Sequence, residues 1–569
     1  MTFPWFLGLG GAVILLTLAA MWLLRDRPQA VFAGLVGGFS IFILEAFAYF
    51  RFRVDDAYIT FRYARNLAAG AGPVWNPGER VEGYTSFSWM LLLALMHLAH
   101  IDIELAAVIL ACASMAALFY LIWRVWLRLS PDAGRLPLPP HAVMAAAGIL
   151  VAANTGTGQW SLSGLETPLA AALIMAVILT YQRESREPGI PWSAVVLSAG
   201  VMTRPEMAFI AALTAAFFFD QAVTDPSARR WRHLGAFVLI FVALAGTWFA
   251  WRWSYYGYFF PNTYYDKVGP TGLMLWRGWL YMSQYWWSYL IAPSLIASVI
   301  LPFLLEGQRR RDAAFICALS AVWLFDVVLE GGDVFGFARF VVPVFAPLYI
   351  ALFFTLGIAV SRATLPVPSR AMLRSAAFGA LTLAAAITVA WSAQTTNFMT
   401  ANRTVMAQWK VEGIWIRDNA PPDYLTAVLA AGIAPYYSGR PTLDMLGLTD
   451  TTIAHTHVPY LGEGYPGHER YNNDYVLTVR RPQIILSGYV AGKPATGEDI
   501  RESETADRGL VPAVNELVHD PRTWDLYEMA AFDHDGLWYS FLVRKDIAST
   551  LPLDWTESSG YRAQPTATR

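Results

Sequence analysis

Two adjacent carboxylates, Asp55 and Asp56, are the first candidates for chemistry in this sequence. They directly follow an apolar segment over 30–50, so they lie beside a membrane surface if that segment spans a bilayer. Carboxylates in such a place can accept a proton from a hydroxyl group or bind a cation, and nearby arginines keep at least one of them ionised. The alternative is a structural cap for a helix over 57–67, because aspartate is favoured at helix N-termini.

Other charged residues between apolar runs are candidates for substrate contacts. Arg204 and Glu206 flank Pro205, and they form either an ion pair with each other or contacts to a ligand. Lys267 is the only lysine among the first 400 residues and follows a tyrosine-rich segment. It suits an anionic phosphate, although lysine also anchors helices at membrane interfaces. Glu166 is either a site residue or an exposed loop carboxylate. The remaining candidates in this half are Asn262, Asp333 and Arg339.

The composition places these residues in a polytopic membrane protein. Of the 569 residues, 56% are hydrophobic and 15% are charged, whereas a soluble domain carries about 25% charged residues. The formal net charge of −2 excludes a general nucleic-acid binder, which needs a basic surplus. The two cysteines both lie in apolar runs and indicate neither a disulfide framework nor a thiolate metal site.

Apolar runs of about 17–25 residues predict roughly 12 membrane-spanning helices. We expect them at residues 5–24, 30–50, 105–127, 142–157, 167–182, 192–203, 206–219, 234–251, 285–305, 313–329, 340–360 and 371–391. The segment Tyr84–His100 is equally apolar, but a crossing there would reverse every later loop. We therefore predict that it lies along the membrane surface.

Arginines in the short loops predict the orientation, because basic residues near helix ends are retained in the cytoplasm. They fall on one side of the predicted spans, at positions 25, 27, 128, 135, 183, 186, 229, 230, 232, 309–311, 362 and 370. The candidate residues then all lie on the outer side. Residues 1–392 are predicted to form the membrane domain. Residues 393–569 are predicted to form a water-soluble α/β domain on the outer face, with strands near 426–429, 484–486 and 539–543.

The segment Asp55–Tyr84 reads DDAYITFRYARNLAAGAGPVWNPGERVEGY and resembles the polyprenyl-phosphate-sugar-dependent glycosyltransferases of the GT-C superfamily. The likeness is strongest to the terminal arabinofuranosyltransferases of mycobacterial cell-wall assembly and their bacterial relatives. Further similar segments are SGLETPL at Ser163–Leu169, TRPE at Thr203–Glu206, PNTYYDK at Pro261–Lys267, GGD and a following arginine at Gly331–Arg339, LDMLGLTD at Leu443–Asp450, and GH at Gly467–His468.

The resemblance implies a GT-C fold of about 11–12 membrane helices, with surface-lying helices in the first outer loop that build an active site. It implies transfer of a sugar, D-arabinofuranose, from a polyprenyl (decaprenyl) monophosphate donor to a cell-envelope glycan at the periplasmic face of a bacterial inner membrane. Asp55 would be the base or essential carboxylate and Asp56 its partner. The implied substrate-binding residues are Glu166, Arg204, Glu206, Asn262, Lys267, Asp333, Arg339, Glu82, Arg62, Tyr84 and His468.

Several alternatives stay open at this point. A GT-C enzyme could use another lipid-linked pentose or hexose to modify lipopolysaccharide or protein, and the reaction could invert or retain the anomeric centre. A transporter or flippase for lipid-linked sugars would instead favour inverted repeats and polar residues at mid-bilayer. A non-enzymatic scaffold would make the aspartates dispensable. No metal site and no cofactor follow from these residues, although a divalent cation at the acidic residues stays open.

Overall fold

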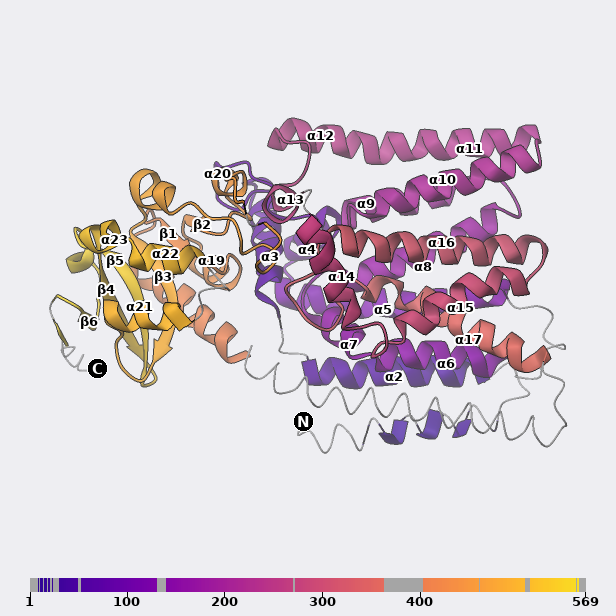
Figure 1. Cartoon of the computed structure of the whole chain (residues 1–569), viewed down its shortest axis with the longest axis horizontal. Coiled ribbons are helices and arrows are strands. Elements are labelled where there is room, and N and C mark those ends of the chain that lie inside the picture. Colours follow the sequence, from indigo (N-terminus) through magenta and orange to yellow (C-terminus); the bar gives the residue numbers. More distant parts are fainter. Residues whose placement is uncertain are drawn as a thin grey trace.

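The fold is described here from a computed structural model of the whole chain. It describes residues 30–49, 53–129, 140–269, 272–362, 403–459, 461–506, 512–558 and 560–561, with scattered positions between 9 and 23. A helical bundle and a sheet-containing region lie side by side along the long axis (Figure 1).

Helices make up the bundle and the segments at its edge. They are α2 (Ala30–Tyr49), α3 (Asp55–Ala68), α4 (Phe87–Leu98), α5 (Ile103–Leu129), α6 (Pro140–Ala153), α7 (Thr155–Leu162), α8 (Thr167–Glu184), α9 (Trp192–Thr203), α10 (Met207–Thr224), α11 (Ala228–Phe241), α12 (Thr247–Tyr256), α13 (Asn262–Lys267), α14 (Gly272–Ser283), α15 (Ile291–Leu304), α16 (Gly307–Leu329) and α17 (Phe345–Arg362). A π turn, Val242–Gly246, joins α11 to α12, and a 3-10 turn, Val342–Val344, precedes α17.

The predicted membrane spans correspond to these helices. Within the described residues, five helical segments are long and apolar enough to cross a membrane, and the bent pair α7 and α8 adds a sixth. Four further apolar helices are shorter, with 10–17 residues. The chain is therefore a multi-helix membrane protein. The described residues contain fewer helices that are long and apolar enough to span a membrane than the roughly 12 predicted. The predicted span at 371–391 lies outside the described residues, and the one at 5–24 is described only at scattered positions.

Several predicted helix boundaries were wrong by a few residues, and two of these differences have an identified local cause. The helix expected from residue 285 begins at Ile291, because Leu290 has a left-handed φ of 54° that ends the preceding turn. The helix expected over 142–157 ends at Ala153, because the side chain of Asn154 caps the next helix by accepting from the N–H groups of Gly156 and Thr157. The helix α14 was not predicted.

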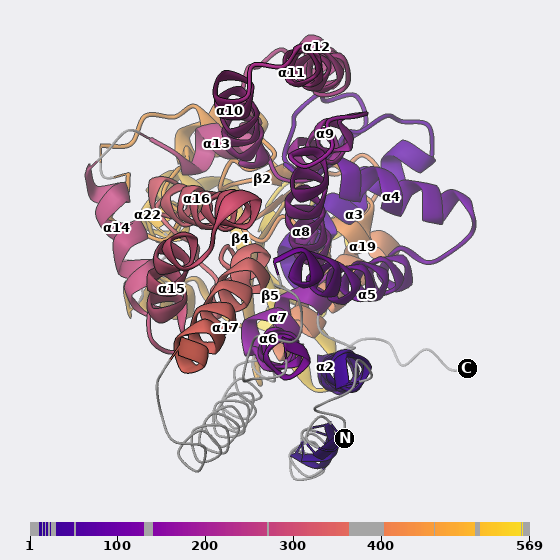
Figure 2. The ribbon, with the colours of Figure 1, turned by 90° about the vertical axis from the view of Figure 1, so that its right-hand side faces the viewer.

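Helix α4 belongs to the segment 51–104, which is named the first outer loop after its predicted position, and it runs across the bundle rather than along it. Figure 2 looks along the bundle and shows α8 and α11 nearly end-on, whereas α4 appears lengthwise. The predicted surface-lying segment 84–100 contains α4. Its direction agrees with a helix at the membrane surface, and α3 packs against it.

A sharp bend between α7 and α8 receives the start of α3. The two helices meet at 114°, and Gly164 lies in the bend with a φ of +94°. A β-carbon on Gly164 would lie 2.8 Å from the β-carbon of Ala57 and 3.0 Å from the ring of Phe61. The N–H of Val54 donates to the carbonyl of Ser163 at 3.0 Å. The glycine of the SGLETPL segment therefore allows the close approach that fixes the Asp55–Asp56 turn.

The part of the structure from residue 403 onward is named the outer region after its predicted position. It is built on one mixed sheet of seven strands in the order β2-β1-β3-β5-β4-β6-β7. The strands are β1 (Thr426–Val428), β2 (Thr442–Asp444), β3 (Ile484–Ala491), β4 (Tyr527–His534), β5 (Leu537–Arg544), β6 (Trp555–Thr556) and β7 (Gly560–Tyr561). β1 runs parallel to β2 and β3, and the other pairs are antiparallel. The three predicted strands correspond to β1, β3 and β5.

Helices precede and connect these strands. One helix covers residues 403–419. The others are α19 (Ile433–Ser438), α20 (Thr451–Ala454), α21 (Gly497–Ala506), α22 (Pro512–His519) and α23 (Pro521–Leu526). A π-helical segment covers Tyr475–Arg480, and a 3-10 turn covers Ala548–Thr550. The predicted boundary at 392/393 lies outside the described residues, so it stays a prediction.

Buried hydrogen bonds from Arg62 join the outer region to the first outer loop. Its guanidinium donates to the carbonyls of Pro435 and Arg440, both at 2.7 Å, and to Trp75 and Asn76 within the loop. Because the side chain is 2% exposed, these bonds replace water that the charge would otherwise need. At this junction α19 packs against α3, and α20 packs against α13 (Figure 1).

Candidate functional site

A cavity of about 940 Å³ lies where the loops at one end of the bundle meet the outer region. Its charged lining residues come from five separate segments, namely α3, the α7–α8 bend, the α9–α10 turn, α13 and the end of α16 with its following loop. They are Asp56, Glu166, Arg204, Glu206, Lys267, Asp326, Glu330, Asp333 and Arg339. Seven of these nine residues were predicted as site residues from sequence, and the structure brings them to one space.

The two aspartates at the start of α3 differ in their surroundings. Asp55 is buried, and its carboxylate accepts hydrogen bonds from the backbone N–H groups of Gly432 at 2.9 Å and Ile433 at 2.7 Å. Asp56 lines the cavity with 28% of its side chain exposed. Neither side chain caps α3, whose N-cap position is Val54. The simple helix-cap alternative is therefore wrong, and Asp56 is the member of the pair that a substrate can reach.

Burial raises the pKa of Asp55 to about 7. The hydrogen bonds from Ile433 and Gly432 lower it in part, whereas the charge of Asp56 raises it further. The physical cause is that a carboxylate loses its hydration inside the protein.

Arg339 lies beside Asp56 and is held by a second carboxylate. Its guanidinium makes a bidentate pair with Asp333, at 2.6 and 2.8 Å, and one nitrogen lies 3.6 Å from a carboxylate oxygen of Asp56. Burial opposes the charge of Arg339, but Asp333 and Asp56 outweigh it and raise the pKa of the guanidinium. The group therefore stays cationic next to the exposed aspartate.

Arg204 bridges two acidic residues in the same cavity. Its guanidinium lies 3.1 Å from Glu166 and 2.5 Å from Glu206. The ion pair between Arg204 and Glu206 was one of the two alternatives left open by the sequence. Contact with a ligand, the other alternative, stays open as well, because Arg204 and Glu206 both line the cavity.

Lys267 reaches the cavity from the end of α13. Its ammonium group makes no hydrogen bond or ion pair with the residues that the structure describes. The stem of Lys267 passes close to Gly467, where a β-carbon would lie 2.8 Å from its Cε atom. The glycine of the GH segment therefore leaves room for this lysine. The neighbouring Asp266 is buried, and burial raises its pKa well above the ordinary value.

Two carboxylates of α16 were not predicted as site residues. Asp326 lies inside α16, and Glu330 follows its last residue, so they are one helical turn apart and face the same cavity. The backbone of Glu330 occupies the C-cap position of α16. The available signal in the sequence was a pair of acids at i and i+4 in an apolar segment, where charges are costly and often functional.

Apolar side chains line another part of the cavity and are exposed at its edge. Phe209 on α10, Leu275 on α14 and Leu329 on α16 are 53%, 45% and 39% exposed. Phe260 and Tyr264 stack with ring centroids 4.3 Å apart and are also exposed. The cavity thus combines charged groups with exposed apolar surface, as an amphiphilic ligand requires.

The structure places other predicted site residues in the framework around the cavity. Glu82 pairs with the buried Arg252 at 2.7 Å, and Asn262 donates to the carbonyl of Gly447 at 2.7 Å. Arg62 joins the two regions as described above. None of these three is among the residues that line the cavity.

Tyr84 and His468 lie closer to the cavity. Tyr84 lines it, and its hydroxyl lies 3.2 Å from that of Tyr256. The ring of His468 lies 3.2 Å from the carbonyl of Pro466, which is a lining residue. Burial lowers the pKa of His468.

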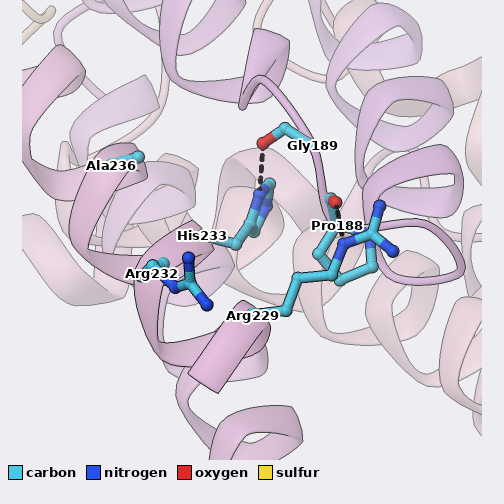
Figure 3. Close-up of a pocket in the computed structure, with 6 residues that line it drawn as sticks. All are labelled: Pro188, Gly189, Arg229, Arg232, His233 and Ala236. Atoms are coloured by element: carbon cyan, nitrogen blue, oxygen red, sulfur yellow. Dashed lines mark hydrogen bonds between the residues drawn. The ribbon is translucent and has the colours of Figure 1, made fainter. Parts of the chain in front are cut away.

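A second cavity, of about 470 Å³, lies near the start of α11. Its lining residues are Pro188, Gly189, Arg229, Arg232, His233 and Ala236 (Figure 3). The ring of His233 contacts the carbonyl of Gly189 at 2.9 Å. Figure 1 shows that α11 begins at the end of the bundle farthest from the sheet. This cavity is lined by cations and no carboxylate among the described residues, so it lacks the paired acid and base groups of the larger one.

The bundle and the outer region together have the fold of a known structure. ArnT from Cupriavidus metallidurans, solved bound to undecaprenyl phosphate, superposes with a TM-score of 0.53 over 92% of this chain and 99% of that chain, at 13% identity. The same protein in its apo state gives a TM-score of 0.52 over 90% and 98%, at 12% identity. The chain therefore has an ArnT-like fold.

Sequence comparison finds two homologues among characterised proteins. The terminal beta-(1->2)-arabinofuranosyltransferase of Mycobacterium tuberculosis is 32% identical over 276 residues, which are 46% of this chain and 42% of that protein. The protein of the same name from Corynebacterium glutamicum is 27% identical over 341 residues, or 52% and 46%. The matched part therefore spans less than half the length of each relative. Residues 397–539 match a domain of unknown function, DUF8728.

Proposed function

We propose that this chain is a membrane glycosyltransferase that transfers D-arabinofuranose from a polyprenyl (decaprenyl) monophosphate donor to a cell-envelope glycan. The observation that carries the proposal is a single cavity that is lined by the carboxylate of Asp56, by the cations of Arg339 and Lys267, and by exposed apolar side chains. Homology to two terminal arabinofuranosyltransferases supports the choice of sugar.

The donor phosphate is assigned to Lys267 and Arg339. Lys267 suits it because its ammonium group makes no hydrogen bond or ion pair with the described residues, and Arg339 suits it because it is kept charged inside the cavity. The prenyl chain would lie along Phe209, Leu275 and Leu329, which are exposed next to these cations. The undecaprenyl phosphate bound to ArnT, which shares this fold, supports a lipid donor.

Asp56 is assigned the role of base. A hydroxyl oxygen of the acceptor forms a bond to the anomeric carbon of the sugar, and the bond from that carbon to the phosphate oxygen breaks. The electron pair of the broken bond leaves with polyprenyl phosphate, whose charge the cations stabilise. The proton of the hydroxyl passes to Asp56. Asp55 is a positioning residue in this scheme, since the backbone of the outer region occupies its carboxylate.

We place this cavity at the periplasmic face of a bacterial inner membrane. The basic second cavity, with Arg229 and Arg232, lies at the opposite end of the bundle and would face the cytoplasm, as the distribution of loop arginines predicts. The outer region and the acceptor glycan then share the periplasmic side with the donor phosphate.

Purified protein in lipid nanodiscs tests the proposal with labelled synthetic decaprenyl-phosphoryl arabinofuranose and an arabinan acceptor. We expect transfer by the wild type and a loss of about 10²- to 10⁴-fold in Asp56→Asn, the usual range for a general base. Asp225→Asn removes an exposed acid far from the cavity and should retain full activity. Full activity of Asp56→Asn would overturn the mechanism.

Parallel assays separate the alternatives. Transfer from lipid-linked hexoses or other pentoses, but not arabinofuranose, would keep the reaction class and replace the sugar. Movement of labelled lipid across proteoliposomes without any sugar transfer would replace the enzyme by a lipid-linked sugar transporter.

A further inference from the structure

Three carboxylates in the wall of the cavity converge. Glu206 comes from the α9–α10 turn, whereas Asp326 and Glu330 come from adjacent turns at the end of α16. One carboxylate oxygen from each residue lies within 4.8 Å of the other two. Oxygens on opposite sides of a bound Ca²⁺ are about 4.6–5.2 Å apart, twice the usual coordination distance. The three oxygens therefore already have the spacing of ligands around one cation.

Asp326 gives a second, independent indication of a missing ligand. It is 8% exposed, lies within a membrane-spanning helix and faces the cavity, yet its carboxylate makes no hydrogen bond or ion pair with any residue that the structure describes. The Oε2 atom of Glu206 is also buried without a partner, while its other oxygen contacts Arg204. The guanidinium of Arg204 donates hydrogen bonds to Glu166 and Glu206 and, among the described residues, makes none to Asp326 or Glu330.

The excess of acidic side chains in the cavity also favours a bound cation. The described residues that line it carry six carboxylates and three cationic side chains. The acids are Asp56, Glu166, Glu206, Asp326, Glu330 and Asp333, and the cations are Arg204, Lys267 and Arg339. An anionic lipid phosphate would enter a space that already has three surplus negative charges if all acids are ionised. A divalent cation would reduce this surplus to one and make phosphate binding favourable.

We propose that Glu206, Asp326 and Glu330 bind one divalent cation. All three ligands are carboxylate oxygens, which are preferred by hard cations such as Mg²⁺, Mn²⁺ and Ca²⁺ rather than by zinc or copper. The role of the cation in offsetting charge near the donor phosphate rests on the proposed function. The binding itself does not, because it depends only on the three carboxylates.

Mn²⁺ titration of the full-length protein in nanodiscs tests this site. A chelator first removes any bound metal and is then removed itself, and free Mn²⁺ is measured by electron paramagnetic resonance during the titration. We expect the wild type to bind one tightly held Mn²⁺ per chain, and Asp326→Asn and Glu330→Gln each to weaken binding by at least about tenfold. Asp225→Asn, which removes one exposed acid elsewhere, should bind like the wild type. Melting curves establish which variants are folded, and Glu330→Gln decides the result if Asp326→Asn unfolds.

Two outcomes would overturn the metal site. The first is that the wild type holds no Mn²⁺ tightly, as expected if the three acids share protons instead. The second is that Asp326→Asn and Glu330→Gln are both folded and bind Mn²⁺ as tightly as the wild type. The experiment contains no sugar donor, so it is separable from the proposed function. Mn²⁺ binding at the cluster without transfer from any lipid donor would refute the function alone, whereas transfer without Mn²⁺ binding would refute the site alone.

Discussion

The carboxylate of Asp55 accepts a 2.9 Å hydrogen bond from the backbone N–H of Gly432, 377 residues further along the chain. This bond attaches the start of α3, and with it the cavity-facing Asp56, to the outer region. A β-carbon at position 432 would lie only 1.9 Å from the carbonyl oxygen of Asp55. The outer region is thus part of what positions the candidate site.

Gly432→Ala should separate the two regions at this point. We expect a loss of about 2–6 kcal/mol in the free energy of unfolding, because the new methyl group overpacks a buried contact and leaves the Asp55 carboxylate without its donors. Thermal unfolding followed by tryptophan fluorescence measures the change. The control is Gly492→Ala in the same region, where a β-carbon meets nothing within 4 Å. Equal melting temperatures for the two variants would contradict the assigned contact.

The free energy of unfolding should depend on pH because burial raises the pKa of Asp55 in the folded protein. Its pKa is raised from 3.8 to about 7 by burial, so between these values the folded protein holds a proton that the unfolded chain has released. The contribution of this group to the unfolding free energy therefore falls as the pH rises through this window. The stability advantage of the wild type over Asp55→Asn should be largest below about pH 4 and should shrink as the pH rises, by about 2.6 kcal/mol between about pH 5 and about pH 8. A difference that does not vary with pH would show that Asp55 titrates normally.

Gly164→Ala tests the approach of α3 to the bend between α7 and α8. Two effects act at this position, a left-handed φ of +94° and a predicted clash with Ala57 at 2.8 Å. Gly257 has a similar φ of +82° but nothing within 4 Å of its β-carbon, so Gly257→Ala isolates the backbone strain of about 1–2 kcal/mol. We expect Gly164→Ala to lower the melting temperature more than Gly257→Ala and also to reduce sugar transfer. Similar losses in both variants would mean that only the φ angle matters.

Most helices of the bundle could be predicted from the sequence, because a long apolar segment in a bilayer must form a helix to pair its backbone polar groups. Helices α9 and α16 end where they were expected, and the choice of a surface position for residues 84–100 agrees with the direction of α4. The amphipathic α14 was missed because its 12 residues carry no long apolar run. The start of α15 was misplaced because no sequence signal marks the left-handed Leu290.

The candidate site was harder to predict, since similar residues in similar loops serve different purposes. Charge beside apolar segments correctly selected Glu166, Arg204 and Lys267 as residues that share one cavity. The family resemblance also selected Arg62 and Asn262, which donate hydrogen bonds to backbone carbonyls of the outer region. Those partners lie far along the chain, so only the three-dimensional contacts distinguish a residue that faces a substrate from one that joins two regions.

Lys267→Gln is expected to weaken the interaction with the donor phosphate while leaving the fold intact. Its ammonium group makes no hydrogen bond or ion pair with the described residues, so its removal breaks no such bond, whereas a charge-assisted bond to phosphate is worth about 1.5–3 kcal/mol. We therefore expect the KM for the lipid donor, or the Kd for decaprenyl phosphate, to rise by roughly 10- to 150-fold, with an unchanged melting temperature. Lys493→Gln removes an exposed lysine of the outer region and should behave like the wild type. A Kd that is equal in both variants would assign the phosphate to other cations of the cavity, of which Arg339 is the first to test.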